Sequence, residues 1–262
     1  MNICCCTVCF HHMNLDEALG HTRAAGFTQI ELVAVPNWIH FTAGKDDPAA
    51  LRALLEKHGL SIAAVHAGGI NCLSPQTASA SVDYLEKVIP LMREFGARQM
   101  VFTGSPRERG GSLRHAVAGL KRLASIAQGE GIRVGLENHY RNWFETLADY
   151  DVLMAELPGP TIGITMDTGH FTSSRVDVSE LIRRYGKRIQ HVHIKDHIGT
   201  QSVAIGAGET QNAKHVGELA QVGFSGYLSL ELEVKDKENA PRYVAEARPQ
   251  MERWGRASAS GQ

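Results

Sequence analysis

Four short segments in the second half of the chain carry side chains of the kinds that bind divalent metal ions. They read GLENH, with Glu137; ITMDTGH, with Asp167; HVHIKD, with His193; and LSLELE, with Glu231. Side chains of a β-strand alternate between two faces, so in each segment the apolar residues share one face and the carboxylate or imidazole lies on the other. If the segments are neighbouring strands of one sheet, these four side chains converge on a single point.

Three carboxylates cannot gather in a partly dry cavity without electrostatic repulsion and loss of hydration. A divalent cation removes this cost by neutralising their charge. One imidazole among three carboxylates is an oxygen-rich, mainly hard donor set. The sequence therefore predicts one divalent metal ion bound by Glu137, Asp167, His193 and Glu231. Mn²⁺ is the favoured ion, and Mg²⁺, Co²⁺, Zn²⁺ and Fe²⁺ are also compatible with these ligands.

A metal ion in this position would act as a Lewis acid on a substrate carbonyl and acidify the neighbouring C–H bond. Glu137 and Glu231 come from different segments, so we expect them to be the catalytic residues: one removes the proton to leave an enediolate, and the other returns it. Return to the opposite face of the same carbon is epimerisation, and return to the adjacent carbon is isomerisation. Departure of a β-hydroxyl instead would make the same site a dehydratase.

The elements that would position these residues alternate regularly along the chain. Strands are predicted over residues 2–9, 29–33, 61–66, 99–102, 133–137, 161–166, 190–194 and 227–232. Helices are predicted over residues 15–25, 48–58, 80–95, 113–128, 147–156, 178–185, 213–222 and 239–254. This alternation indicates parallel strands with crossover helices, and eight uninterrupted units favour a single α/β domain of the (β/α)8 TIM barrel type. No glycine-rich dinucleotide fingerprint follows the first strand, which disfavours a Rossmann fold.

We expect one barrel domain over residues 1–255, followed by a flexible tail over residues 256–262 that is rich in Ser, Ala and Gly. Barrel sites form at the carboxyl ends of the strands, so the long loops 34–47, 67–76, 103–112 and 197–211 should wall the pocket. Glycines precede six of the predicted strands and are expected to end helices with positive φ; they are Gly26, Gly59, Gly96, Gly131, Gly186 and Gly223.

Three further residues are predicted to contact a substrate in this pocket. Glu31 ends the second strand and would hydrogen-bond sugar hydroxyls or orient a metal ligand, with a purely structural role as the alternative. His66 ends the third strand before a pair of glycines. Lys195 faces the same way as His193 and would hold an oxyanion, unless it forms an ion pair with Asp196 or Glu233. The roles of three other features stay open: Glu145, His139 and the loop 38–41 with its aromatic residues.

Composition limits the partners and the compartment. The net charge is −1, so no long-range field attracts nucleic acid or an acidic membrane surface. No apolar segment approaches the roughly 20 residues needed to cross a bilayer. Cys6 and Cys9 have the CxxC spacing of some metal sites, but the chain offers no second pair and no loop there to shape a site. The five cysteines are therefore expected to be buried, free thiols in a reducing cytoplasm; they are Cys4, Cys5, Cys6, Cys9 and Cys72. Homo-oligomerisation is left open.

Taken together, the four segments resemble the xylose isomerase-like TIM barrel superfamily, also called the sugar phosphate isomerase/epimerase family. The resemblance covers essentially the whole chain and is most specific in its second half. It implies the same four metal ligands that the alternation of side chains in the strands predicts. It also implies that the substrate is a small-molecule sugar or keto-sugar. It also implies that His170, in DTGH, contacts the substrate and that GAGE, at residues 206–209, forms a glycine-bearing loop after the seventh strand.

At two positions this chain differs from particular branches of the family, and these differences narrow the range of activities that we expect. The DNA-repair branch presents a further histidine where this chain has Thr103, and its near-zero net charge also disfavours a phosphate-backbone binder. Ketose 3-epimerases commonly place an arginine soon after the strand-seven histidine, whereas this chain reads HIKDHIGTQS. We therefore predict a metal-dependent sugar isomerase or epimerase. The alternatives are a dehydratase of a keto-sugar, inosose or related cyclic polyol ketone, and a non-catalytic sugar or metal binder.

Overall fold

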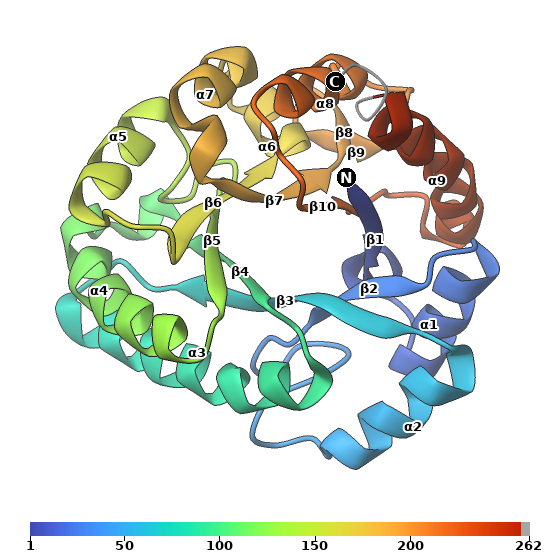
Figure 1. Cartoon of the computed structure of the whole chain (residues 1–262), viewed down its shortest axis with the longest axis horizontal. Helices are drawn as coiled ribbons and strands as arrows, with labels where there is room; N and C mark the ends of the chain where they lie inside the picture. Colours follow the sequence, from blue (N-terminus) through green and yellow to red (C-terminus); the bar gives the residue numbers. More distant parts are fainter. Residues whose placement is uncertain (258–262) are drawn as a thin grey trace.

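The computed structural model describes residues 1–257 and contains one closed barrel of eight parallel strands (Figure 1). Around the barrel the strands follow the order β1, β10, β7, β6, β5, β4, β3 and β2. Their bounds are β1 Asn2–Cys6, β2 Gln29–Val33, β3 Ser61–Ile70, β4 Gln99–Gly104, β5 Arg133–Glu137, β6 Ile162–Asp167, β7 Ile189–Ile194 and β10 Tyr227–Leu230. The structure confirms the predicted TIM barrel.

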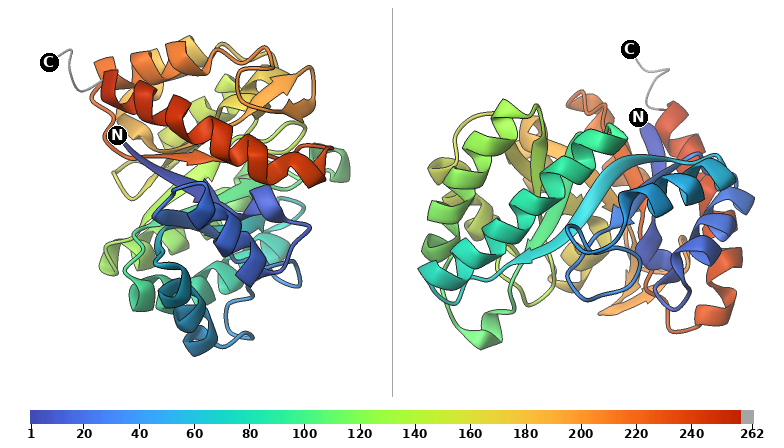
Figure 2. Two further views of the ribbon diagram at one scale, coloured as in Figure 1. Left: turned by 90° about the vertical axis from the view of Figure 1, so that its right-hand side faces the viewer. Right: turned by 90° about the horizontal axis from the view of Figure 1, so that it is seen from below.

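Helices surround this barrel and cover its outer face, as the two side views also show (Figure 2). They are α1 Leu15–Ala24, α2 Pro48–His58, α3 Pro75–Phe95, α4 Leu113–Gly129, α5 Leu147–Glu156, α6 Thr168–Ser173, α7 Val178–Tyr185, α8 Asn212–Gln221 and α9 Ala240–Ala257. The apolar face of each strand packs against them, so Leu136, Ile164 and Val192 are fully buried in the core between strands and helices. Within the described residues no helix combines the length and the apolar character that crossing a membrane requires.

Local signals explain where these helices begin and end. Asn14 and Thr146 each form a capping box, in which the side chain accepts a hydrogen bond from the backbone three residues later. Gly59 adopts the left-handed conformation after α2, as predicted. Gly186 does not: its φ is −51°, and it begins a short 3₁₀ turn. A side chain at Gly186 would meet Val222 Cγ2 at 2.8 Å, so close packing rather than positive φ requires this glycine.

Several element bounds differ from the prediction. The first strand ends at Cys6, because a 3₁₀ turn over Thr7–Phe10 replaces its last predicted residues. The third strand continues to Ile70 through an irregularity between His66 and Gly69. Apart from short 3₁₀ turns, three of the described elements were not predicted: the helix α6, and the two strands of an antiparallel hairpin, β8 Asp196–Ile198 and β9 Gln201–Val203. α9 runs to Ala257, and the rest of the predicted tail lies outside the described residues.

Small residues inside the barrel make room for larger inward side chains. Gly163 pairs with Gly135 on the neighbouring strand, and a Cβ at Gly163 would lie 2.4 Å from the backbone oxygen of Arg188 and 2.5 Å from Gln190 Cδ. A backbone oxygen cannot rotate away, so we expect Gly163→Ala to lower the free energy of unfolding by about 1–3 kcal/mol through overpacking.

A matched glycine substitution separates this effect from backbone entropy. Gly217 lies inside α8, and a Cβ added there would have no atom within 4 Å apart from its own helix backbone. We expect Gly217→Ala to raise the free energy of unfolding by roughly 0.5–1 kcal/mol, because alanine favours the helix. Urea denaturation of both variants measures the difference. Equal stability of the two variants would contradict the tight interior packing.

Candidate metal centre

The structure brings the four predicted ligands together at one end of the barrel. Glu137 ends β5, Asp167 ends β6, His193 is the next-to-last residue of β7, and Glu231 follows β10 directly. One ligand atom from each lies within 4.8 Å of the others, and all four residues are buried. These strands are neighbours in the barrel, so strand alternation alone aims the four side chains at one place.

The imidazole of His193 lies at the centre of this group. Its Nδ1 is 2.8 Å from Glu137 Oε1 and 3.9 Å from Asp167 Oδ2, and it also contacts Glu231 Oε2. Nδ1 is therefore the ring nitrogen that faces the three carboxylates, and Nε2 points away from them toward β2.

Burial and neighbouring charges both shift the pKa values of the three carboxyl groups in the centre. Burial raises the pKa of Asp167 to about 7, against the opposing charge of Lys195. Burial also acts to raise the pKa of Glu137, but the charge of His193 and its hydrogen bond outweigh this and hold the pKa at about 2. The pKa of Glu231 is held well below its usual value, because His193 and Lys195 outweigh its burial. The two cationic side chains thus offset part of the carboxylate charge.

The donor set fits a divalent cation. Asp167 Oδ2 and Glu231 Oε2 are buried and have no hydrogen-bond partner among the described residues, although each lies within ion-pair distance of a cationic side chain. Buried carboxylate oxygens are normally hydrogen-bonded, so two such oxygens in a single cluster indicate that they serve another ligand. Three carboxylates and an imidazole supply the oxygen-rich ligands of a divalent metal site. The assignment of the individual ligands stays a prediction.

Asp167 is positioned by Asn138, which the sequence analysis did not single out as functional, and by the backbone of His170. Its backbone N–H donates to Asn138 Oδ1 at 2.7 Å, and Asn138 Nδ2 donates to the carbonyl of Asp167 at 2.9 Å. Its carboxylate Oδ1 accepts the backbone N–H of His170 at 2.7 Å and so caps α6. The only sequence signal for Asn138 is its place directly after Glu137 in GLENH.

A cavity of about 150 Å³ opens over the cluster at the mouth of the barrel. Glu137 and Glu231 both line it, so the two predicted catalytic carboxylates reach the space that a substrate would occupy. The predicted walls contribute Trp38 and Thr103. The remaining lining residues are Cys6, Val8, Val33, His66, His139, Asn142, His170 and Glu233.

Two of the four predicted substrate contacts, His66 and His170, line this cavity. His66 Nε2 lies 2.9 Å from Glu137 Oε2, so it contacts one of the two catalytic candidates. The ring of His170 lies 3.9 Å from that of His139, which gives His139 a place in the pocket wall that the sequence left open. Burial lowers the pKa of His170 well below its usual value, with the charge of Lys195 adding to the effect. His170 is therefore a neutral group at the pocket wall.

Lys195 does not line the cavity and is fully buried. Its Nζ lies 2.8 Å from Glu233 Oε2, 3.2 Å from Glu231 Oε1 and 3.4 Å from Asp167 Oδ2. This geometry corresponds to the ion pair with Glu233 that the sequence offered as an alternative to oxyanion binding. Lys195 is therefore placed to form ion pairs rather than to contact a substrate directly.

Asp196 has a different partner from the one considered in the sequence analysis. Its Oδ2 accepts the backbone N–H groups of Gly206, at 2.8 Å, and Gly208, at 3.1 Å, and its Oδ1 accepts that of Thr210 at 3.0 Å. A Cβ at Gly208 would lie 2.2 Å from Asp196 Oδ1. The glycine-bearing loop GAGE is thus wrapped around this carboxylate beside the mouth.

Glu145, whose role was also open, joins two loops at the same end of the barrel and does not line the cavity. Its Oε2 lies 3.3 Å from Arg107 Nε, and its Oε1 accepts the hydroxyl of Ser174 at 2.9 Å. Trp38 is 45% exposed at the rim, whereas Phe41, from the same loop, is buried in the core. Of the aromatic residues in this loop, only Trp38 lines the cavity, so Trp38 alone is placed to meet a substrate.

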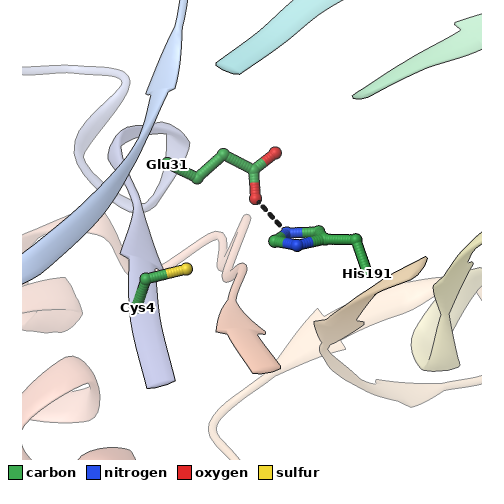
Figure 3. A group of neighbouring side chains, drawn as sticks. All are labelled: Cys4, Glu31 and His191. Atoms are coloured by element: carbon green, nitrogen blue, oxygen red, sulfur yellow. Dashed lines mark hydrogen bonds and ion pairs between the residues drawn. The ribbon is translucent and has the colours of Figure 1, made fainter. Parts of the chain in front are cut away.

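Glu31 lies beneath the four predicted metal ligands and does not line the cavity. Its side chain is fully buried, and one of its oxygens lies 2.8 Å from His191 Nε2 (Figure 3). Its oxygens also lie 3.0 Å from His193 Nε2. Burial acts to raise its pKa, but His193 and His191 outweigh this and hold the pKa well below its usual value. Glu31 is therefore an ionised acceptor between two histidines, and it does not line the cavity in which a substrate contact was predicted.

The chain matches a known family model over nearly its whole length. The model described as "Xylose isomerase-like TIM barrel" covers residues 19–254. The rhizopine catabolism protein MocC of Rhizobium meliloti is 26% identical over 255 residues, covering 84% of this chain and 74% of MocC. An inosose dehydratase of Salmonella typhimurium is 27% identical over 159 residues, covering 61% of this chain and 48% of the dehydratase. The match thus spans about half the length of that enzyme.

Solved structures show the same fold at lower identity. A D-tagatose 3-epimerase-like protein has a TM-score of 0.80 and 18% identity, with 99% of each chain covered. The IOLI protein, solved with a binding zinc atom, has a TM-score of 0.77 and 18% identity, with 97% of this chain and 98% of that chain covered. At these identities the likeness shows a shared barrel.

Proposed function

This chain belongs to the xylose isomerase-like TIM barrel family, and on that premise we propose that it is a divalent-metal-dependent isomerase or epimerase of a sugar or keto-sugar. One observation carries the proposal: Glu137 and Glu231 line the same cavity, and both contact Nδ1 of His193 from different strands. Two carboxylates on either side of a common centre are what a proton transfer between two faces of one carbon requires.

We propose that Glu137, Asp167, His193 and Glu231 hold the metal ion, with Mn²⁺ favoured. When bound, this ion would polarise a substrate carbonyl and acidify the adjacent C–H bond. A neighbour in fold was solved with zinc, so Zn²⁺ belongs in the test as well.

The chain's own residues would divide the remaining work. One of Glu137 and Glu231 removes the proton from carbon, and the other returns it from the opposite side. The hydrogen bond from His66 to Glu137 Oε2 leaves Oε1 of that carboxylate facing His193 and so orients it. His170, His139 and Asn142 offer polar groups to substrate hydroxyls from the pocket wall.

The direct test is solvent deuterium uptake by a panel of free ketoses and inososes, measured by NMR with the Mn²⁺-loaded and Zn²⁺-loaded protein. We expect uptake at the carbon beside the carbonyl of at least one compound, accompanied by formation of its epimer or isomer. A fully metal-loaded protein that binds a panel member without exchanging any proton would show a binder rather than an enzyme.

A dehydratase is the second candidate, and the relatives in sequence favour it. The Salmonella relative is an inosose dehydratase, and several further inosose dehydratases match at similar identity. In this reaction one of the two carboxylates, Glu137 or Glu231, removes the proton from carbon, the C–O bond to the β-hydroxyl breaks, and the hydroxyl takes up a proton and leaves as water. Mass analysis of the products separates the two candidates, because only the dehydratase product is lighter by one water.

A further inference from the structure

Beneath the proposed metal centre lies a layer of fully buried polar side chains that the mechanism above does not use. It contains Glu31 from β2, His191 from β7 and Cys4 from β1 (Figure 3). Two further strands, β1 and β10, separate β2 from β7 in the barrel, so Glu31 reaches the histidines across the interior. An ionised carboxylate in such a place has a substantial desolvation cost unless its hydrogen bonds compensate it.

Glu31 finds its partners in the two histidines of the HVH segment. Nε2 of His193 is 3.0 Å from each of its oxygens, and Nε2 of His191 is 2.8 Å from Oε2. A carboxylate only accepts hydrogen bonds, so each of these ring nitrogens must carry a proton. Nδ1 of His193 faces Glu137 and Glu231 in the same way, so the metal-free ring carries a proton on both nitrogens. A metal ion bound at Nδ1 would replace that proton and leave the Nε2 proton, donated to Glu31, as the only one on the ring.

We propose that Glu31 is a positioning residue that fixes the tautomer and the ring orientation of His193, and that His191 holds Glu31 in place for this task. The inference rests on the proposed metal centre. Histidine ligands commonly donate their second N–H to a carboxylate, which makes the ligand nitrogen more basic and fixes the ring. His191 acts one step further away, through Glu31, and contacts no predicted metal ligand by a hydrogen bond.

The same three residues also have the composition of a small metal site, since one ligand atom each of Cys4, Glu31 and His191 lies within 4.8 Å of the others. Two observations favour the positioning role. Both oxygens of Glu31 are already hydrogen-bonded to imidazole nitrogens. Burial raises the pKa of the Cys4 thiol far above its usual value, and Glu31 adds to this, which disfavours a thiolate at this position.

The first test is metal affinity, measured by calorimetric titration of the metal-free protein with Mn²⁺ and Zn²⁺. We expect Glu31→Gln to weaken binding by roughly 10–100-fold, the usual effect of losing such a support. Cys4→Ser is the matched control, because Cys4 lies in the same layer and makes no hydrogen bond to His193; its affinity should equal that of the wild type. His191→Gln should weaken binding less than Glu31→Gln, and the double variant no more than Glu31→Gln alone.

The second test is the tautomer itself, read by ¹⁵N NMR of the histidine side chains in the Zn²⁺-loaded wild type. We expect the proton of His193 on Nε2, with Nδ1 unprotonated. A merely structural role for Glu31 would change the melting temperature without changing the metal affinity. Wild-type affinity in a folded Glu31→Gln variant would overturn the proposal. If that variant does not fold, a proton on Nδ1 in the wild type would overturn it.

Other outcomes are also decisive. Two ions per chain, one of them lost in Cys4→Ser, would make Glu31 a ligand of a second site and overturn the positioning role. Absence of any metal binding by the wild type would instead contradict the proposed metal centre, and the positioning role would fall with it. If the wild type binds metal and Glu31→Gln binds it equally tightly, the proposed metal centre is supported and only the inference about Glu31 is wrong.

Discussion

Glu137→Gln and Glu231→Gln are each expected to lower the rate of substrate conversion by about 100–10,000-fold, the usual contribution of a positioned acid or base. An amide has nearly the same shape as the carboxylate but cannot take up the proton. Both residues also belong to the proposed metal site, so the rates are compared at saturating Mn²⁺ with the bound metal measured. Glu156→Gln, an exposed substitution on α5, serves as the control and should keep full activity.

The two variants should differ in isotope exchange, because a two-base mechanism gives each carboxylate its own face of the substrate. We expect one variant to keep solvent deuterium exchange from one epimer and lose it from the other, and the second variant to show the reverse pattern. Loss of exchange from both epimers in one variant only would indicate a single base. Full conversion by either metal-loaded variant would remove that residue from the mechanism.

Removal of the metal is expected to abolish turnover and to lower the melting temperature, and both should return when Mn²⁺ is added back. An ion that binds only the folded state adds about 2.7 kcal/mol at a free concentration 100 times its Kd. For a domain of this size that corresponds to roughly 5–10 °C in melting temperature. The metal-free protein should stay folded, because His193 and Lys195 already offset part of the carboxylate charge.

Differential scanning calorimetry with and without a chelator measures this shift. Asp167→Asn is a suitable comparison, because it removes one carboxylate from the cluster. The amide oxygen of the new asparagine can still cap α6. Its melting temperature should respond weakly to Mn²⁺. Identical melting curves of the wild type with and without the ion, together with full activity after chelation, would exclude this cluster as the metal site.

The barrel and the convergence of Glu137, Asp167, His193 and Glu231 could be predicted from the sequence alone. The reason is that both depend on short periodicities. Alternation of side chains in a strand repeats every two residues, and regular strand–helix alternation leaves few ways to arrange eight units. Each ligand stands at the end of a strand whose apolar residues already specify its orientation. Neighbouring strands then bring the ligands together without further information.

The roles of Glu31, Lys195 and Asp196 depended on tertiary structure. Sequence alternation placed Glu31 and Lys195 on the inner face but could not tell the open cavity from the interior beneath it. Glu31 meets His191 and His193 across the barrel, 160 and 162 residues away along the chain. Asp196 accepts backbone N–H groups of the GAGE loop instead of pairing with Lys195, because this loop folds around its carboxylate at the start of the unpredicted hairpin β8–β9.

The sequence by itself determined which side chains face inward, and therefore the fold and the four side chains that converge at the mouth of the barrel, because strand periodicity is a local property. Only the tertiary structure decided how deep each inward side chain lies and which charges share a hydrogen bond. Depth depends on the register between strands and on the closure of the barrel, and pairing depends on distances between residues that are remote in the chain. Neither quantity is encoded within a window of a few residues.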